Sequence, residues 1–203
     1  MRDNQGLIGF MLGVCLLFGA LPAHSAGWSP GTLRQDWAPF LLGLAGGIAA
    51  HELGHVVVAK ARGYHLDHDG LSITYPDADF SRSGHLQTAS AGLQTQWLVT
   101  EAVFARQQLR DPDNPPGPVA AGLVCAHLAI SAAYLTVLKD HDRGDVVGMS
   151  DASGLSTDSL VLLALVPALL DGWRLFGDQV PRWVPALSIG FKGAALIAIW
   201  TYR

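Results

Sequence analysis

The sequence predicts an all-α membrane protein, a polytopic bundle of about five to six apolar helices with a short β-hairpin or strand after the helix expected at Ala38 to about Arg62. Half of the 203 residues are hydrophobic and only 15% are charged. The mean hydropathy of +0.29 is typical of multi-pass membrane proteins. The net charge of −4 comes without any basic cluster, which excludes nucleic acid as a partner. We therefore expect an integral protein surrounded by the lipid bilayer, in the inner membrane of a bacterium.

The N-terminal segment, residues 1–26, predicts targeting to a membrane. An apolar run from Leu7 to Leu21 is followed by the small residues Ala23, Ser25 and Ala26. This pattern is typical of a secretory signal peptide, and the same run is long enough for a first transmembrane helix. Both interpretations remain open. Residues 27–203 are expected to form one membrane-embedded domain.

The segment from Ala38 to about Arg62 is expected to form a helix that carries the motif His51-Glu52-Leu53-Gly54-His55. Residues four apart share one face of a helix, so the two imidazoles can bind one Zn²⁺. Glu52 is then placed to act as general base on a zinc-bound water. Because this helix is apolar nearly all round, the metal would lie within the bilayer or deep in a bundle. The alternative is a pair of structural histidines that bond neighbouring helices.

Residues 63–88 differ in character from the apolar segments. The stretch 71–75 alternates as a strand does and lies between turn signals, and a second extended piece at 80–86 is expected to pair with it. Such a strand would offer an edge to an extended substrate. The cluster His65, Asp67, His68 and Asp69 has metal-binding groups, but no regular spacing fixes them, and a solvated loop is the preferred interpretation.

The rest of the chain predicts further helices at residues 89–110, 118–138, from 158 through Asp171, and 183–202. Pro167 is expected to kink or interrupt its helix one turn before Asp171. Residues 139–157 are polar and rich in Asp without periodicity, and we expect them to form a solvated loop.

A catalytic zinc site normally has three protein ligands and a water, so the histidine pair needs a third group. Asp171 is the first choice, because its carboxylate follows a run of leucines in an apolar segment. Glu101, the only other glutamate beside Glu52, is the second choice, and His127 is the third. Each of these three could instead make a hydrogen bond between helices.

Two stretches, GGIAAHELGHVVVAKARGY and Val166 to Gly172 (VPALLDG), resemble the site-2-protease family of intramembrane zinc metalloproteases. The resemblance implies a metalloprotease-like domain with one Zn²⁺ per chain, His51, His55 and Asp171 as ligands and Glu52 as catalytic base. It implies hydrolysis of peptide bonds in membrane-associated protein substrates. The family pattern N-x-x-P-x-x-x-L-D-G is not fully kept, because Pro167 is one residue closer to the Asp and Ala164 stands in place of the Asn.

Two other functions are compatible with the same residues. One is a non-catalytic membrane scaffold or regulator with a degenerate protease fold. The other is an ion- or proton-handling membrane protein that uses His51, Glu52, Glu101 and His127. Against the transporter, the chain has no paired, Gly- or Pro-broken helices in two similar halves.

Overall fold

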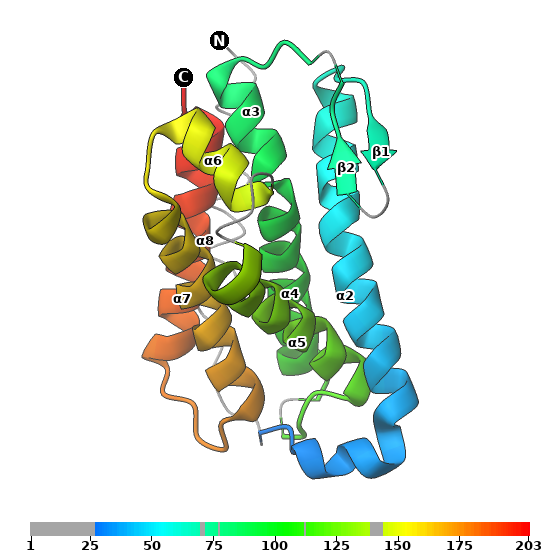
Figure 1. Ribbon diagram of the computed structural model, residues 1–203. Coiled ribbons are helices and arrows are strands. Elements are labelled where there is room, and N and C mark those ends of the chain that lie inside the picture. Colours follow the sequence, from blue (N-terminus) through cyan, green and yellow to red (C-terminus); the bar gives the residue numbers. More distant parts are fainter. Residues whose placement is uncertain (1–26, 70–71, 77, 112, 139–143) are drawn as a thin grey trace.

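The computed structural model describes residues 27–69, 72–76, 78–111, 113–138 and 144–203, so the targeting segment 1–26 lies outside the described residues. Within them the chain is an elongated bundle of helices with two short strands beside one end of α2 (Figure 1). The elements are η1 (Pro30–Thr32), α2 (Leu33–Ala61), β1 (Asp67–Asp69), β2 (Ser72–Thr74), α3 (Arg82–Ala89), α4 (Ala91–Arg110), α5 (Pro118–Ala133), the π-helical turn η2 (Tyr134–Leu138), α6 (Asp145–Ser153), α7 (Thr157–Phe176) and α8 (Trp183–Thr201).

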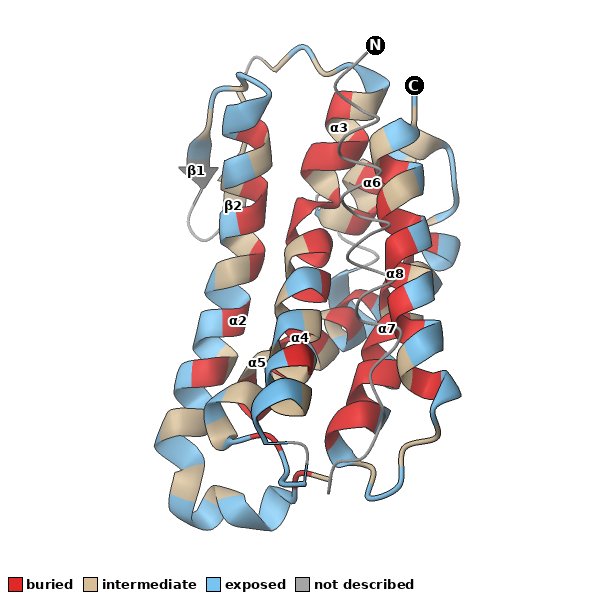
Figure 2. Cartoon of the chain, turned by 180° about the vertical axis from the view of Figure 1, so that it is seen from behind, coloured by how far each residue is buried: buried red, intermediate tan, exposed pale blue. Residues whose placement is uncertain are grey.

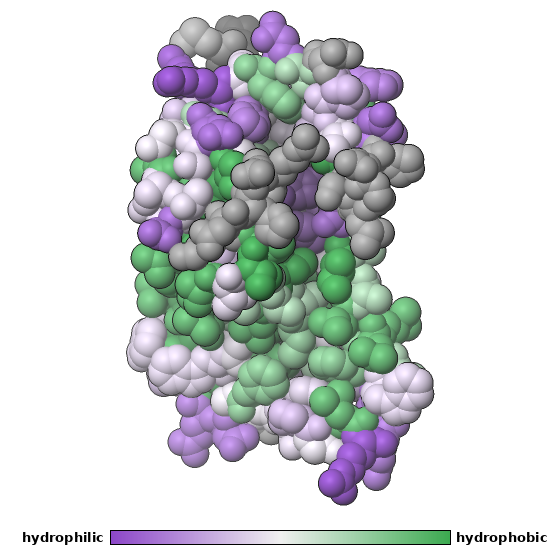
Figure 3. All heavy atoms as spheres, viewed as in Figure 1, coloured by the Kyte–Doolittle hydropathy of each residue, from purple (hydrophilic) through white to green (hydrophobic). Residues whose placement is uncertain are grey.

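Four helices of the described residues are long and apolar enough to cross a membrane: Pro30–Ala61, Pro118–Leu138, Thr157–Phe176 and Trp183–Thr201. The space-filling view shows a hydrophobic band across the middle of the molecule, between two hydrophilic ends (Figure 3). The prediction of an apolar helical protein is confirmed. The expected number of five to six is not confirmed, because four such helices lie among the described residues and segment 1–26 is outside them. The expected helix at 89–110 exists as α4, but it is not one of the four.

One narrow face of α2 is buried, and the rest of this helix is exposed or intermediate (Figure 2). Its buried residues recur about every fourth position: Gly43, Gly47, His51, Gly54, His55 and Ala59. The two glycines let α5 approach closely. A Cβ on Gly43 would overlap the backbone of Val119, and one on Gly47 would overlap the side chain of Ala126. Close packing of α2 on its neighbours therefore turns both histidines toward the protein interior.

The two strands form an antiparallel pair, in which Asp67 lies opposite Thr74 and His68 opposite Ile73. The expected pairing of a strand with residues 80–86 is wrong, because residues 82–89 form α3. Ser81 caps this helix, its hydroxyl accepting a hydrogen bond from the Gly84 N–H at 3.1 Å. The partner strand is instead β1, which contains most of the His/Asp cluster that was expected in a loop.

The solvated loop expected at 139–157 is wrong for residues 145–153, which form α6, while residues 139–143 lie outside the described residues. Val146, Met149 and Ala152 are buried at a spacing of three, and they join a core cluster that includes Trp97 of α4. The helix ends at Gly154, whose φ of +76° is a left-handed conformation that favours glycine. The described part of this segment is therefore an amphipathic helix packed on the bundle, with Asp145 as its first residue.

Pro167 lies inside α7, which continues from Thr157 to Phe176. The expected interruption before Asp171 is therefore absent in this helix. Asp171 lies on the buried face of α7 and is 0% exposed.

Candidate metal centre

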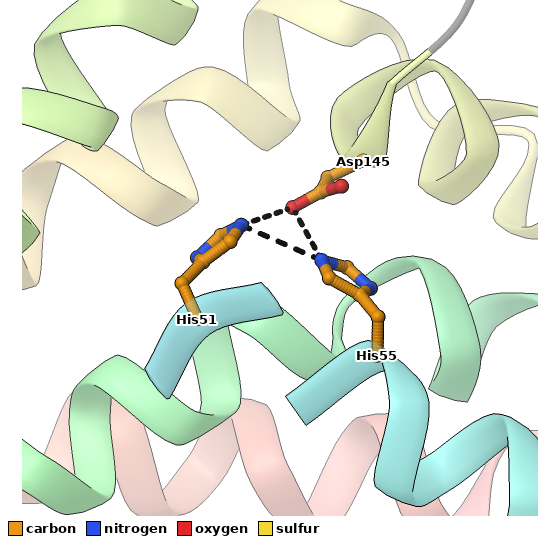
Figure 4. Close-up of side chains that lie close together, drawn as sticks. All are labelled: His51, His55 and Asp145. Atoms are coloured by element: carbon orange, nitrogen blue, oxygen red, sulfur yellow. Dashed lines mark hydrogen bonds and ion pairs between the residues drawn. The ribbon is translucent and has the colours of Figure 1, made fainter. Parts of the chain in front are cut away.

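The side chains of His51, His55 and Asp145 converge on one point (Figure 4). The Nε2 atoms of the two imidazoles are 3.4 Å apart. Asp145 Oδ2 lies 2.9 Å from His51 Nε2 and 3.2 Å from His55 Nε2. The histidines come from adjacent turns of α2, and the carboxylate comes from the first residue of α6 across from them.

This triangle has the dimensions and the chemistry of a zinc site. Ligand atoms about 2.0–2.2 Å from a tetrahedral zinc lie roughly 3.3–3.6 Å from one another. The three observed separations, 2.9, 3.2 and 3.4 Å, are close to this range. Two imidazoles and one carboxylate are also a known donor set of catalytic zinc, which keeps its fourth position for water or substrate. Among the described residues, these three side chains could therefore hold a metal ion such as zinc.

Two neighbouring groups hold these side chains by hydrogen bonds. His55 Nδ1 lies 2.8 Å from the backbone carbonyl oxygen of Thr88, which accepts a hydrogen bond from the Nδ1–H and leaves Nε2 directed at the centre. The Tyr134 hydroxyl donates to Asp145 Oδ2 at 2.5 Å. Such outer partners fix the orientation of metal ligands.

Gly92, near the start of α4, faces the Nε2 atoms of the two imidazoles. A Cβ at this position would overlap the Nε2 atoms of both His51 and His55. Close approach of the α4 backbone therefore requires glycine at this position. Gly54 of α2, which lies between the two histidines in sequence, is required in the same way, because a Cβ there would overlap Ala91 and Thr95 of α4.

Glu52 follows His51 on α2 and is partly exposed. Its charge acts on His55, on Tyr134 and on Tyr75, which comes directly after β2. Burial and the charges of Asp145 and Glu52 raise the pKa of Tyr75, so its hydroxyl stays protonated and can act as a hydrogen-bond donor. The region around the centre thus has a carboxylate that can accept a hydrogen bond and a phenol that can donate one.

The Asp145 carboxyl is ionised next to the imidazoles. Burial alone would raise its pKa, but the His55 and His51 rings outweigh this and hold the pKa below its usual range. The side chain is 17% exposed, whereas those of His51 and His55 are 4% and 5% exposed. Asp145 is consequently the most exposed of the three side chains.

Asp171 is not brought to the histidine pair, which corrects the predicted ligand set. Its Oδ1 accepts from Ser188 at 2.9 Å and Arg174 at 3.3 Å. Its Oδ2 accepts from Lys192 at 2.6 Å and lies 3.1 Å from His127 Nδ1. An ionised carboxylate has about four lone-pair sites, and these four partners occupy them.

The two alternative ligands belong to the same buried group. Glu101 accepts two hydrogen bonds from Arg174, at 2.6 and 3.0 Å, and one from Lys192 at 2.6 Å. His127 uses Nδ1 toward Asp171. We call Glu101, His127, Asp171, Arg174 and Lys192 the charged cluster. It ties α4, α5, α7 and α8 together, and each of its carboxylates is paired with cations.

Known proteins give no further guide to this arrangement. No family model, curated protein or solved structure matches the chain. Its function must therefore be inferred from the geometry described above.

Sequence reasoning missed Asp145 and Tyr134. The signal for Asp145 was local: an acidic residue opens a short run with apolar residues at a spacing of three, which ends at a glycine. Tyr134 shares one face of its helix with His127 and Ser131, at positions i, i+4 and i+7, in a segment that was interpreted only as a membrane span.

Proposed function

We propose that this protein is an intramembrane zinc metalloprotease that hydrolyses peptide bonds of membrane-associated proteins, with His51, His55 and Asp145 as the ligands of one Zn²⁺. The single observation that supports this most is the convergence of two histidine Nε2 atoms and one carboxylate oxygen within 3.4 Å of one another. The motif His51 to His55 supplies both imidazoles together with the adjacent Glu52.

The proposed chemistry assigns one task to each group. A bound Zn²⁺ would lower the pKa of a coordinated water toward neutrality and polarise the scissile carbonyl. Glu52 accepts the proton of the attacking water and returns it to the leaving amine. The backbone carbonyl of Thr88 holds His55 in place through its hydrogen bond. The pair β1 and β2, beside α2, offers a strand edge to an unwound substrate.

The alternative functions have weaker support in the geometry. An ion- or proton-handling protein would use His51, Glu52, Glu101 and His127. In the charged cluster, however, Glu101 is paired with Arg174 and Lys192, and His127 Nδ1 faces Asp171. A non-catalytic scaffold would not need Glu52 beside a three-ligand centre.

Replacement of Glu52 by Gln tests the proposal. We expect the wild type and Glu52→Gln to contain one zinc per chain by elemental analysis. We expect cleavage of single-span test substrates in liposomes to fall by about 10²- to 10⁴-fold in the variant, because general acid–base catalysis contributes about this much. Asp151→Asn, an exposed carboxylate-to-amide change on α6, is the control and should retain both zinc and cleavage. A wild type without zinc would overturn the proposal, and zinc without any cleavage would favour the scaffold.

Gly92→Ala tests whether the space that Gly92 leaves beside the two Nε2 atoms is needed. The added methyl group would overlap both imidazoles, which cannot retreat without leaving the centre. Overpacking of this kind costs about 1–3 kcal/mol, so we expect zinc affinity to fall about tenfold or more. Gly190→Ala is the matched control, because a Cβ there meets nothing within 4 Å. Equal zinc affinity of the two alanine variants would show that α4 does not confine the histidines.

A further inference from the structure

We propose that Tyr134 is a positioning residue of the metal centre, whose hydroxyl holds Asp145 in the orientation in which it binds zinc. This inference rests on the proposed function and extends it to a residue for which neither the motif nor the family resemblance gives a role.

The contact itself is specific. The Tyr134 hydroxyl donates to Oδ2 of Asp145 at 2.5 Å, and the same oxygen faces both histidine Nε2 atoms. Tyr134, His51 and His55 therefore all contact the same oxygen of Asp145, Oδ2. A hydrogen bond on the ligating oxygen fixes the rotation of the carboxylate, which is how outer partners orient metal ligands.

Asp145 needs such support more than the histidines do. His51 and His55 project from a 29-residue helix that α4 and α5 confine, and both residues are buried. Asp145 is the first residue of a nine-residue helix. The N-cap of this helix is Gly144, which has no side chain that could cap it. The hydroxyl of Tyr134 therefore holds the Asp145 side chain, at the start of the short helix α6, by a hydrogen bond from the bundle.

The backbone of Tyr134 is also unusual. Here α5 changes into a π-helical turn, Tyr134 to Leu138. Turns of this kind are rare and are frequent at functional sites, where they re-aim a side chain. Tyr134 is 4% exposed, so its ring is fixed by packing and its hydroxyl has little freedom to turn toward solvent.

Tyr134→Phe removes only this hydroxyl, and zinc affinity is the direct measurement. We expect the dissociation constant for Zn²⁺, measured by competition with a chromophoric chelator on the full chain in detergent, to rise about 10- to 100-fold, the usual effect of losing an outer partner. With Co²⁺ in place of Zn²⁺, the ligand-field absorption bands of the variant should shift, because the geometry around the metal changes.

Tyr202→Phe is a closely matched control. The Tyr202 hydroxyl also donates to α6, at the carbonyl oxygen of Ala152, 3.1 Å away and seven residues beyond Asp145. If Tyr134 only docked α6, both variants would weaken zinc binding equally, and the inference would be overturned. Wild-type zinc affinity and an unchanged Co²⁺ spectrum in Tyr134→Phe would overturn it while leaving the proposed function intact. Absence of zinc binding by the wild type would overturn the proposed function first.

Discussion

Asp145→Ala is expected to reduce the zinc content of the purified protein from one per chain to nearly none, whereas Asp171→Asn is expected to retain it. The Asp145 carboxylate faces both imidazoles at 2.9 and 3.2 Å. Loss of a ligand should exceed the roughly 10- to 100-fold effect of losing an outer partner. Asp171 is occupied by Ser188 and by three members of the charged cluster, and it shares no partner with His51 and His55. Elemental analysis after dialysis against a weak chelator measures both variants.

Asp151→Ala is the control for loss of a carboxylate from α6, because Asp151 is exposed on the same helix. It should bind zinc as the wild type does. The opposite pattern, with zinc retained by Asp145→Ala and lost by Asp171→Asn, would restore the ligand set that the sequence predicted. Loss of zinc in all three variants would indicate that the measurement reports folding rather than ligation.

The histidine pair could be predicted because its geometry is local. A separation of four residues on a helix fixes the relative position of His51 and His55, independently of the rest of the chain. The apolar length of α2, α5, α7 and α8 is local in the same sense, and so the helical membrane class was predicted from composition and runs of apolar residues.

The third group could not be found in this way, because it depends on which elements meet. Asp145 is 90 residues from His55 in sequence, and no periodicity connects the two. Asp171 was a reasonable choice, since a carboxylate in an apolar helix must have a partner. The sequence shows Arg174 one turn away, but it does not show that Lys192 of α8 and Glu101 of α4 meet at the same place. Asp171, the carboxylate that residue chemistry alone would assign to the metal, is therefore paired with cations inside the bundle.

The charged cluster itself leads to the second large expected effect, on stability. Two carboxylates, Asp171 and Glu101, face two cations, Arg174 and Lys192, through four ion pairs of 2.6 to 3.3 Å. The formal charges balance. Asp171 is 0% exposed and Lys192 is 2% exposed, so a charge left without its partner has no access to water. Removal of one partner of a buried pair typically costs about 3–5 kcal/mol for this reason.

Asp171→Asn and Lys192→Met should therefore each lower the free energy of unfolding by about 3–5 kcal/mol. The double variant removes one charge of each sign and restores the balance. We expect it to be at least as stable as either single variant, which is a strong departure from additivity. Equilibrium unfolding in mixed detergent micelles, followed by circular dichroism, gives the three values, and Lys60→Met, at an exposed lysine of α2, is the control.

The same variants separate stability from metal binding. Asp171→Asn should be unstable but bind zinc with wild-type affinity while folded, and Asp145→Ala should show the reverse. Additive losses in the double variant would mean that Asp171 and Lys192 act independently. In that case the carboxylate would not be held by pairing, and the reason given for its absence from the metal centre would fail. The two experiments therefore test one physical statement: the buried carboxylate of Asp171 is paired with cations, and the carboxylate of Asp145 is available to a metal.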